Sequence, residues 1–375
     1  MASTDPVALT QALVRYKTVN PPGDEHDCAH HLGDLLEAAG FEVTYVDAGE
    51  RRTNVVARLG NGQGAPLCFT GHIDTVPLGA QPWSVDPFAG DIVDGKLYGR
   101  GATDMKAGVA AFVAATIDRA DTLANGPGVV LVITSGEETG CDGAFHLTEQ
   151  ADVLGEAGAM VVAEPTSNYP LVGHKGALWL HALAHGVTAH GSTPEHGENA
   201  VYKAARMVGE LERFDFERPE HDVLGRDTLN VGTIGGGLNM NSVPDVCRIG
   251  IDIRTTPGAC HAGIRTALED RLGADLAALE TVVDLEGVWT EPQQAWVAQV
   301  YRIMADILDE MPTARGAAFF TDASALTPYY GDIPTIILGP GEAAMAHQTD
   351  EYCYVERIAQ AKMVYETLID HWLTA

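Results

Sequence analysis

Three apolar runs of strand length constrain the fold of this chain most. Each is followed by a histidine or a glutamate. The runs and the residues after them are 67–70 with His72, 128–134 with Glu137 and Glu138, and 159–163 with Glu164. They are far too short to span a membrane. Helical patterns lie between them, and apolar strands separated by helices indicate a sheet covered on both faces. We therefore expect these side chains to meet at one edge of an α/β sheet.

The order of predicted elements divides the chain into two domains. A chain of 375 residues is longer than one hydrophobic core usually supports. Helix and strand patterns alternate from Asp5 to Gly173 and resume at Glu291. Between them we predict strands 177–185, 228–234, 246–254 and 281–285 with helices 200–211 and 259–272. This β-α-β-β-α-β order is typical of a ferredoxin-like module. Because His347 lies in the last segment, the simplest arrangement is a catalytic domain of 1–173 and 289–375 with an insertion at 174–288.

Composition narrows the choice of partners. The net charge is -29 and the sequence pI is about 4.6, which disfavours nucleic acid and anionic membranes because both would repel the chain. A cationic substrate and a solvated acidic surface both account for this charge. Asp5 and Pro6 open an amphipathic helix with no apolar signal core, so we expect a cytoplasmic protein. The six cysteines form no C-x-x-C pair, and we interpret most of them as buried apolar residues and give none a metal role.

His72 and Asp74 are spaced for a supported metal ligand. Residues two apart in an extended segment point the same way. The Asp74 carboxylate could then accept the far N–H of the imidazole and fix its tautomer. A buried histidine paired with a neighbouring aspartate, with no metal, explains the same spacing.

Asp104 ends a glycine-rich loop that leads into a helix. The loop Tyr98–Gly108 lacks the spacing of a phosphate-binding loop. Asp104 could cap the helix, or it could bridge two cations.

The adjacent carboxylates Glu137 and Glu138 are the sharpest signal. They repel each other after a buried strand unless a cation or a raised pKa compensates. In a two-zinc site one of them binds metal and the other serves as general base. Glu164 and His347 would complete a set of nitrogen and oxygen ligands suited to zinc. The loop at Gly341 is expected to offer exposed backbone amides to a substrate carboxylate.

These five segments, in this order, resemble the zinc-dependent amidohydrolases that include acetylornithine deacetylase, succinyl-diaminopimelate desuccinylase, aminoacylase and the glutamate-releasing carboxypeptidases. The resemblance covers essentially the whole chain. It implies a mixed-sheet catalytic domain flanked by helices, with the inserted module as lid and dimer interface. It also implies two Zn²⁺ per subunit, for which Co²⁺ can substitute. The implied ligands are His72, Asp104 and Glu164 for one zinc, and His347, Asp104 and Glu138 for the other.

The same resemblance assigns the remaining site residues. Glu137 is the implied base and Asp74 orients His72. His190 is the implied oxyanion donor, often supplied across a dimer. The implied substrate-binding residues are Asn241, Arg254, Lys175, Thr321 and Gly341.

We therefore expect a homodimeric hydrolase that removes the acyl group from a small N-acyl amino acid. A carboxypeptidase or dipeptidase with the same metals is the alternative. A non-catalytic binding protein on this fold would be expected to lose Glu137 or a ligand, and this chain keeps them all.

Overall fold

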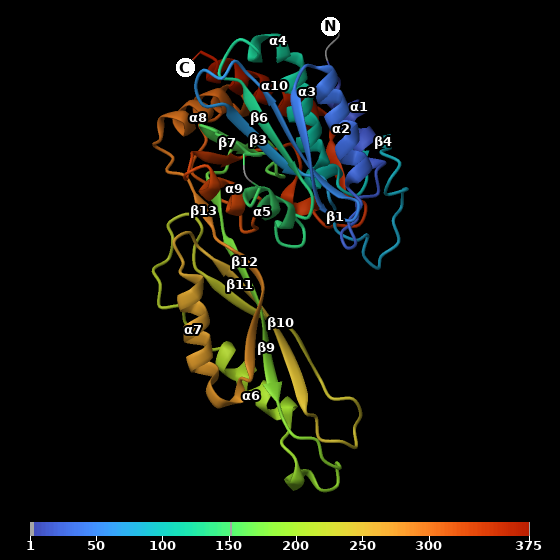
Figure 1. Cartoon of the computed structure of the whole chain (residues 1–375), viewed down its shortest axis with the longest axis vertical. Helices are drawn as coiled ribbons and strands as arrows, with labels where there is room; N and C mark the ends of the chain where they lie inside the picture. Colours follow the sequence, from blue (N-terminus) through green and yellow to red (C-terminus); the bar gives the residue numbers. More distant parts are fainter. Residues whose placement is uncertain (1–3, 151, 375) are drawn as a thin grey trace. The chain divides into compact units, whose positions relative to one another are not determined.

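The computed structural model describes residues 4–150 and 152–374. The chain forms two compact units (Figure 1). The larger contains the residues up to 173, 289–315 and those from 321 onward, and the smaller contains 174–288 and 316–320. The segment 316–320, expected in the larger unit, belongs to the smaller one because Ala317 accepts a hydrogen bond from the Lys175 amide at 3.0 Å.

A mixed six-stranded sheet forms the centre of the larger unit, in the order β1-β2-β6-β3-β7-β14. The strands are β1 (Glu42–Gly49), β2 (Arg52–Leu59), β3 (Leu67–His72), β6 (Val129–Thr134), β7 (Ala159–Val162) and β14 (Thr335–Ile337). The last four are mutually parallel, whereas β1 and β2 run antiparallel to their neighbours. Every residue of β3, β6 and β7 is buried, as the apolar runs predict. Their carboxyl ends therefore share one edge of the sheet.

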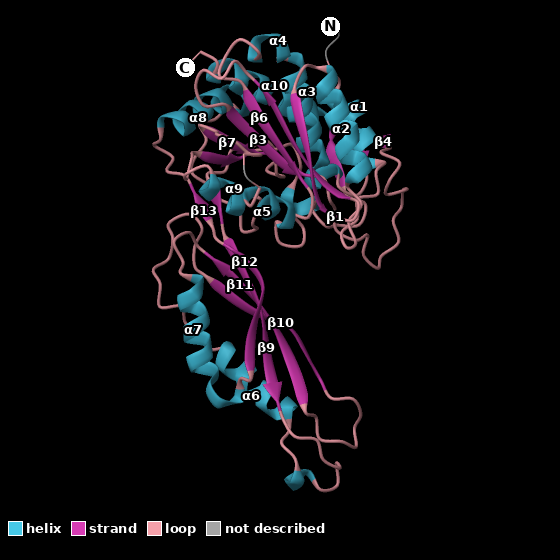
Figure 2. Ribbon diagram, in the orientation of Figure 1, coloured by secondary structure: helices cyan, strands magenta, loops and turns pink. Residues whose placement is uncertain are grey.

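Helices flank this sheet (Figure 2). They are α1 (Pro6–Val14), α2 (His26–Ala38), α3 (Ala107–Asp118), α4 (Ala120–Leu123), α5 (Asp142–Thr148), α8 (Ala295–Leu308), α9 (Ala323–Tyr329) and α10 (Val355–Trp372). The buried helix α3 contacts both α1 and α10. Phe69 of β3 lies 5.9 Å from the Phe112 ring of α3 and 5.4 Å from the Tyr365 ring of α10, between ring centroids. One apolar core thus holds β3 against its covering helices.

A small three-stranded sheet adjoins the site loops. It comprises β4 (Ile92–Val93), β5 (Lys96–Tyr98) and β15 (Tyr352–Tyr354), in the order β15-β5-β4. The pairing of Tyr352 with Tyr98 joins the segment before Asp104 to the segment after His347. Two ligand-bearing regions that are distant in sequence are therefore side by side.

The smaller unit has its own sheet and core. Four antiparallel strands follow the order β10-β11-β9-β12, and they are β9 (Gly176–His185), β10 (Thr228–Gly236), β11 (Val246–Thr255) and β12 (Ala278–Leu285). Helices α6 (Ala200–Leu211) and α7 (His261–Leu272) share an apolar cluster with this sheet. The chain passes between units in β8 (Gly173–His174) and β13 (Val288–Trp289). The predicted β-α-β-β-α-β module is confirmed.

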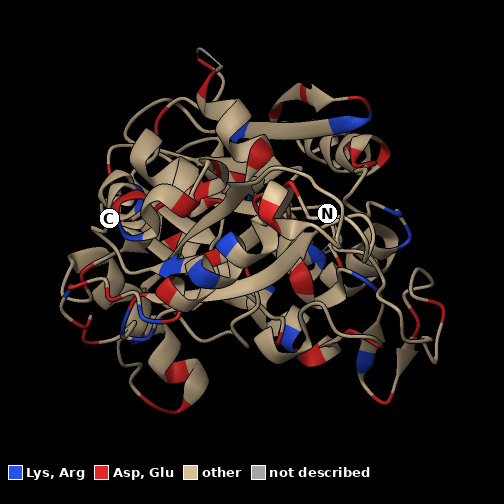
Figure 3. Cartoon of the chain, turned by 90° about the horizontal axis from the view of Figure 1, so that it is seen from below, with Lys and Arg blue, Asp and Glu red and all other residues tan. Residues whose placement is uncertain are grey.

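Helix α1 begins at the predicted residues. Asp5 caps α1 by accepting from the Val7 amide, with Pro6 as first helical residue. Acidic residues are scattered over many elements rather than gathered in one (Figure 3), which favours a generally acidic surface. Five cysteines are buried and Cys260 is exposed. Within the described residues, no helix combines the length and apolar character needed to cross a membrane.

Candidate metal centre

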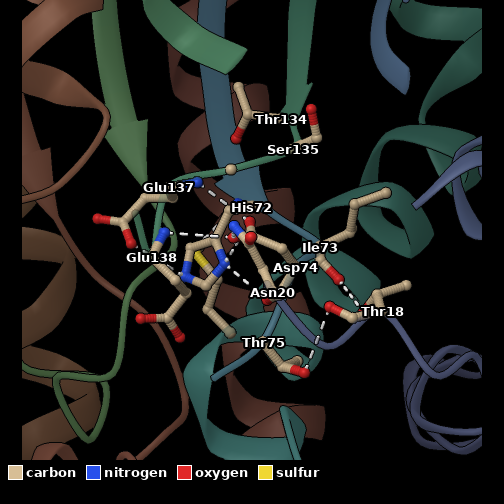
Figure 4. Close-up of polar contacts among 12 residues, drawn as sticks. Thr18, Asn20, His72, Ile73, Asp74, Thr75, Thr134, Ser135, Glu137 and Glu138 are labelled. Atoms are coloured by element: carbon tan, nitrogen blue, oxygen red, sulfur yellow. Dashed lines mark hydrogen bonds and ion pairs between the residues drawn. The ribbon is translucent and has the colours of Figure 1, made fainter. Parts of the chain in front are cut away.

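The carboxyl edge of the larger sheet brings the predicted ligands together. His72 is the last residue of β3 and pairs with Thr134 of β6. Glu137 and Glu138 follow β6 after the turn at Ser135 and Gly136, and Glu164 follows β7. Parallel pairing is what converts three separate strand ends into one cluster. Figure 4 shows His72 beside the two glutamates that follow β6.

Asp104 lies between two histidines. Its Oδ1 is 3.2 Å from His72 Nε2, and its Oδ2 is 3.4 Å from His347 Nε2. Glu164 Oε1 lies 3.7 Å from His72 Nε2, on the first side. Glu138 Oε2 lies 3.1 Å from His347 Nε2, on the second side. This is the arrangement that a bridging carboxylate between two cations requires.

The donor set fits divalent metal ions. Two groups have candidate ligand atoms that all lie within 4.8 Å of one another: His72, Asp104 and Glu138, and His72, Glu137 and Glu164. The buried Oε1 of Glu138 has no hydrogen-bond partner among the described residues. A buried carboxylate oxygen without a partner is costly unless a cation meets it. Imidazole nitrogens and carboxylate oxygens are ligands that zinc accepts.

Burial raises the pKa of all three glutamates in this cluster, and neighbouring carboxylates add to the shift. Burial raises the pKa of Glu137 well above its usual range, and Glu164 adds to the effect while His72 opposes it. Burial likewise raises the pKa of Glu164, with a further contribution from Asp104. Burial also raises the pKa of Glu138. Bound cations would supply the positive charge that this cluster lacks.

The two histidines differ in access to solvent. The His72 side chain is 1% exposed and that of His347 is 54% exposed. Hydrogen bonds with Asp104 and Glu138 raise the pKa of His347 to about 10. Although burial acts to raise the pKa of Asp104, hydrogen bonds from His347 and His72 hold it below its usual range. The cluster is therefore closed at His72 and open at His347.

Asp74 contacts both His72 and the turn that carries the two glutamates. The nearest partner of His72 Nδ1 is the main-chain carbonyl of Asp74 at 3.0 Å, and the carboxylate Oδ1 is farther away at 3.4 Å. The carboxylate also accepts from the amides of Glu137 at 3.1 Å and Glu138 at 3.2 Å, and from Asn20 Nδ2 at 2.9 Å (Figure 4). Asp74 therefore connects the orientation of His72 with that of the glutamate turn.

Two asparagines support this turn and are absent from the sequence prediction. Asn54 Oδ1 accepts from the Ser135 amide at 2.8 Å and from its hydroxyl at 3.0 Å. Asn20 bonds the Asp74 carboxylate. The Asn-Pro-Pro-Gly stretch that begins at Asn20 predicts a turn, and this is the signal by which Asn20 could have been found. Asn54 lies inside an ordinary apolar strand, and nothing in its neighbourhood in the sequence marks it.

His190 and Asn241 lie together in the smaller unit. The Gly191 amide donates to the Asn241 carbonyl at 2.7 Å, and His190 forms an antiparallel bridge with Ser242. Both residues are exposed, and His190 Nδ1 has Ser192 Oγ at 2.7 Å. The exposed segments that carry His190 and Asn241 are thus paired through their main chains.

Arg254 lies near the opposite end of β11. Its Nε is 2.9 Å from Asp252 Oδ1, and its guanidinium lies 5.6 Å from the ring centroids of both Trp179 and Phe320. From Val246 to Arg254 the strand advances eight residues, about 26 Å at ~3.3 Å per residue. The smaller unit therefore carries its candidate substrate residues in two separate places.

Three predicted substrate residues are buried and already engaged. Lys175 Nζ donates to the Arg226 carbonyl at 2.5 Å. The Thr321 hydroxyl oxygen accepts from the Ala323 amide at the start of α9. Gly341 itself is buried, and its role toward a substrate carboxylate stays a prediction. A Cβ at Gly341 would lie 2.3 Å from the Thr103 carbonyl oxygen, so this loop packs tightly against its neighbour.

A family model described as peptidase family M20/M25/M40 matches residues 68–371. The chain belongs to this family. As an M20 member it is a hydrolase, and the resemblance inferred from its motifs is confirmed.

Curated relatives align with nearly the whole length of this M20 chain. A succinyl-diaminopimelate desuccinylase of Cereibacter sphaeroides (strain KD131) is 34% identical over 380 residues, which covers 96% of this chain and 97% of that protein. An acetylornithine deacetylase of Myxococcus xanthus is 31% identical over 355 residues, covering 90% of each.

Solved structures show the same fold at lower identity. An M20 family metallo-carboxypeptidase from Sulfolobus solfataricus has a TM-score of 0.83 at 16% identity, covering 99% of this chain and 100% of that one. A Bacillus subtilis M20 protein described as a dinuclear metal binding peptidase has a TM-score of 0.72 at 15% identity, covering 99% and 98%. The mixed-sheet domain with an inserted module is thus a known architecture.

Proposed function

We propose that this M20 protein is a two-zinc amidohydrolase that removes the acyl group from a small N-acyl amino acid. The observation that carries the proposal is Asp104, whose two oxygens face His72 and His347 separately. One metal would be held by His72, Asp104 and Glu164, and the other by His347, Asp104 and Glu138, with Co²⁺ able to substitute. When bound, two zinc ions polarise a scissile carbonyl and lower the pKa of water.

Glu137 is the proton carrier in this mechanism. Its carboxylate is 3.9 Å from His72 Nε2, yet its amide is fixed by Asp74, so it is close to the ligands and firmly oriented. Burial raises the pKa of its carboxyl, which strengthens its carboxylate as a base that takes a proton from water and later gives it to the leaving amine. Glu138, which faces His347, is better placed to bind metal.

His190 and Arg254 lie near opposite ends of β11, which suggests that each active site is shared between two chains. An N-acyl amino acid spans on the order of 10 Å, since a residue extends by ~3.6 Å. His190 and Arg254 are separated within one chain by far more than this. If His190 stabilises the oxyanion and Arg254 holds the substrate carboxylate, two copies must contribute. We therefore propose a homodimer formed through the smaller unit, with Asn241 beside His190 at the shared site.

The proposal of N-acyl amino acids as substrates is supported by the curated relatives. Those similar along nearly the whole chain are a succinyl-diaminopimelate desuccinylase and an acetylornithine deacetylase. A dipeptidase or carboxypeptidase activity of the same site is the second candidate, since a fold neighbour is described as a metallo-carboxypeptidase.

The test is a hydrolysis screen with zinc-loaded protein. Substrates should include N-acetylornithine, N-succinyl-diaminopimelate, other N-acyl amino acids and dipeptides, with Glu137→Gln as the inactive control. We expect turnover of an N-acyl amino acid that a chelator abolishes. Turnover of dipeptides alone would select the second candidate, and chelator-insensitive turnover would contradict the metal mechanism.

A further inference from the structure

Glu351 is a buried carboxylate that receives four hydrogen bonds and lies four residues after His347. Its Oε2 accepts from Arg100 Nη1 at 2.6 Å and from the Gly101 amide at 3.0 Å. Its Oε1 accepts from the amides of Thr103 at 2.8 Å and Asp104 at 3.1 Å. The side chain is fully buried. One carboxylate therefore binds three main-chain amides of the loop that carries Asp104.

Other bonds join the same two segments. The Gly99 amide donates to the Glu351 carbonyl at 2.9 Å, and the Thr103 hydroxyl donates to the Tyr352 carbonyl at 2.7 Å. With these bonds the loop before Asp104 is attached to the segment after His347 over its whole length. Glu351 is the residue that reaches the Asp104 amide itself.

Charge balance explains why a carboxylate is tolerated so close to an acidic cluster. Arg100 is almost fully buried and forms an ion pair with Glu351. Its Nη2 also donates to the Pro77 carbonyl at 3.2 Å. The pair adds no net charge beside Asp104, while its geometry orients the surrounding amides. A neutral side chain could not accept from all these donors.

We infer that Glu351 is a positioning residue for the metal centre. It fixes the main chain of Asp104 so that Oδ1 faces His72 and Oδ2 faces His347, and it fixes the loop of His347 by the same contacts. The inference rests on the proposed metal site, but the ordering of the loop that it asserts can be measured without metal.

The first test is Glu351→Gln, which keeps the shape but removes the charge and replaces one acceptor by an NH₂ group. Asp227→Asn is the matched control, because Asp227 in the smaller unit accepts from Arg218 Nη1 at 2.7 Å and from the Thr256 amide at 2.6 Å. Partners that orient metal ligands typically change metal affinity by about 10–100-fold. We expect a loss of that size in calorimetric zinc affinity for Glu351→Gln, with an altered visible spectrum of the cobalt-loaded protein. Asp227→Asn should change neither.

The second test is hydrogen exchange on metal-free protein. Peptides covering 99–104 and 347–352 should exchange faster in Glu351→Gln and at the wild-type rate in Asp227→Asn. If Glu351→Gln does not fold, Glu351→Asp keeps the charge on a shorter side chain and should show the same losses in weaker form. Wild-type zinc affinity, cobalt spectrum and exchange in a folded variant would overturn the inference. A wild-type protein that binds no metal would instead sink the proposed function, and exchange would still decide the role of Glu351.

Discussion

The candidate residues of the larger unit are fixed by contacts within the chain, whereas those at the tip of the smaller unit are exposed. Asp74 alone bonds Asn20 and the amides of Glu137 and Glu138. His190, by contrast, has a side-chain bond only to Ser192 among the contacts found for it in the described residues. The larger unit therefore orients its candidate groups by itself, and the proposed homodimer would supply the surface on which His190 acts.

The tip of the smaller unit carries further signs of an uncovered surface. Leu238 and Met240 are 98% and 104% exposed, next to Asn241. Large apolar side chains that gather at the surface mark interaction sites more often than isolated ones do. The proposed homodimer would cover them.

The largest expected effect is the loss of bound zinc and turnover in Asp104→Ala, a change in the larger unit. Because Asp104 faces both histidines, its loss should reduce bound zinc from two equivalents per chain toward none and abolish turnover. Metal analysis after loading with excess zinc and gel filtration measures this. Asp227→Asn serves as the control and should keep both ions. Retention of one ion in folded Asp104→Ala would show that the carboxylate belongs to one metal only.

A second prediction separates the adjacent glutamates. Glu137→Gln should keep both metals and lose turnover by about 10²–10⁴-fold, the usual contribution of a positioned acid–base group. Glu138→Gln should weaken metal binding at the His347 side, where Glu138 lies 3.1 Å from the imidazole. Calorimetry and steady-state kinetics on both variants decide the matter. Identical behaviour of the two would mean that the roles are assigned wrongly.

The same comparison explains which parts were predictable from sequence. His72, Glu137, Glu138 and Glu164 follow apolar strands, and parallel pairing of those strands makes sequence order report spatial proximity. The β-α-β-β-α-β order was equally predictable, because the apolar residues of each element repeat with the spacing of a strand or of a helix. The family resemblance then supplied the roles that spacing alone leaves open.

Long-range hydrogen bonding was not predictable. Glu351 is separated from Arg100 by 251 positions, and Asn54 from Ser135 by 81. Neither pair carries a local signal. The segment 316–320 was misplaced for the same reason, since its pairing partner at Lys175 is distant in the chain. The burial of Gly341 was likewise not predictable, since the main chain at Thr103, against which it packs, is distant in the sequence.

A third prediction tests the exposed tip through subunit exchange. His190→Ala should lower turnover by roughly 10²–10³, the usual cost of removing one oxyanion donor. Mixing His190→Ala with Glu137→Ala chains should then restore activity, because one site of each mixed dimer regains both wild-type groups. Mass spectrometry of differently labelled chains verifies exchange. Verified exchange without recovery would place His190 in its own chain's site or outside catalysis.

The smallest expected effect concerns Arg254, at the other end of β11 from the tip. Its guanidinium is oriented by Asp252 and lies over the rings of Trp179 and Phe320, so it resembles the larger unit in being held by its own chain. Arg254→Lys keeps the charge but removes the planar fork that can bind a carboxylate with two hydrogen bonds. Losing one such bond to a charged group costs about 1.5 kcal/mol, or roughly tenfold in affinity. We expect KM to rise by about this factor with little change in kcat, and Arg248→Lys on the same strand, exposed and away from these rings, should change neither. A fall in kcat at constant KM would show that Arg254 acts on the reacting bond rather than on the substrate carboxylate, and the division of labour between the two ends of β11 would have to be reversed.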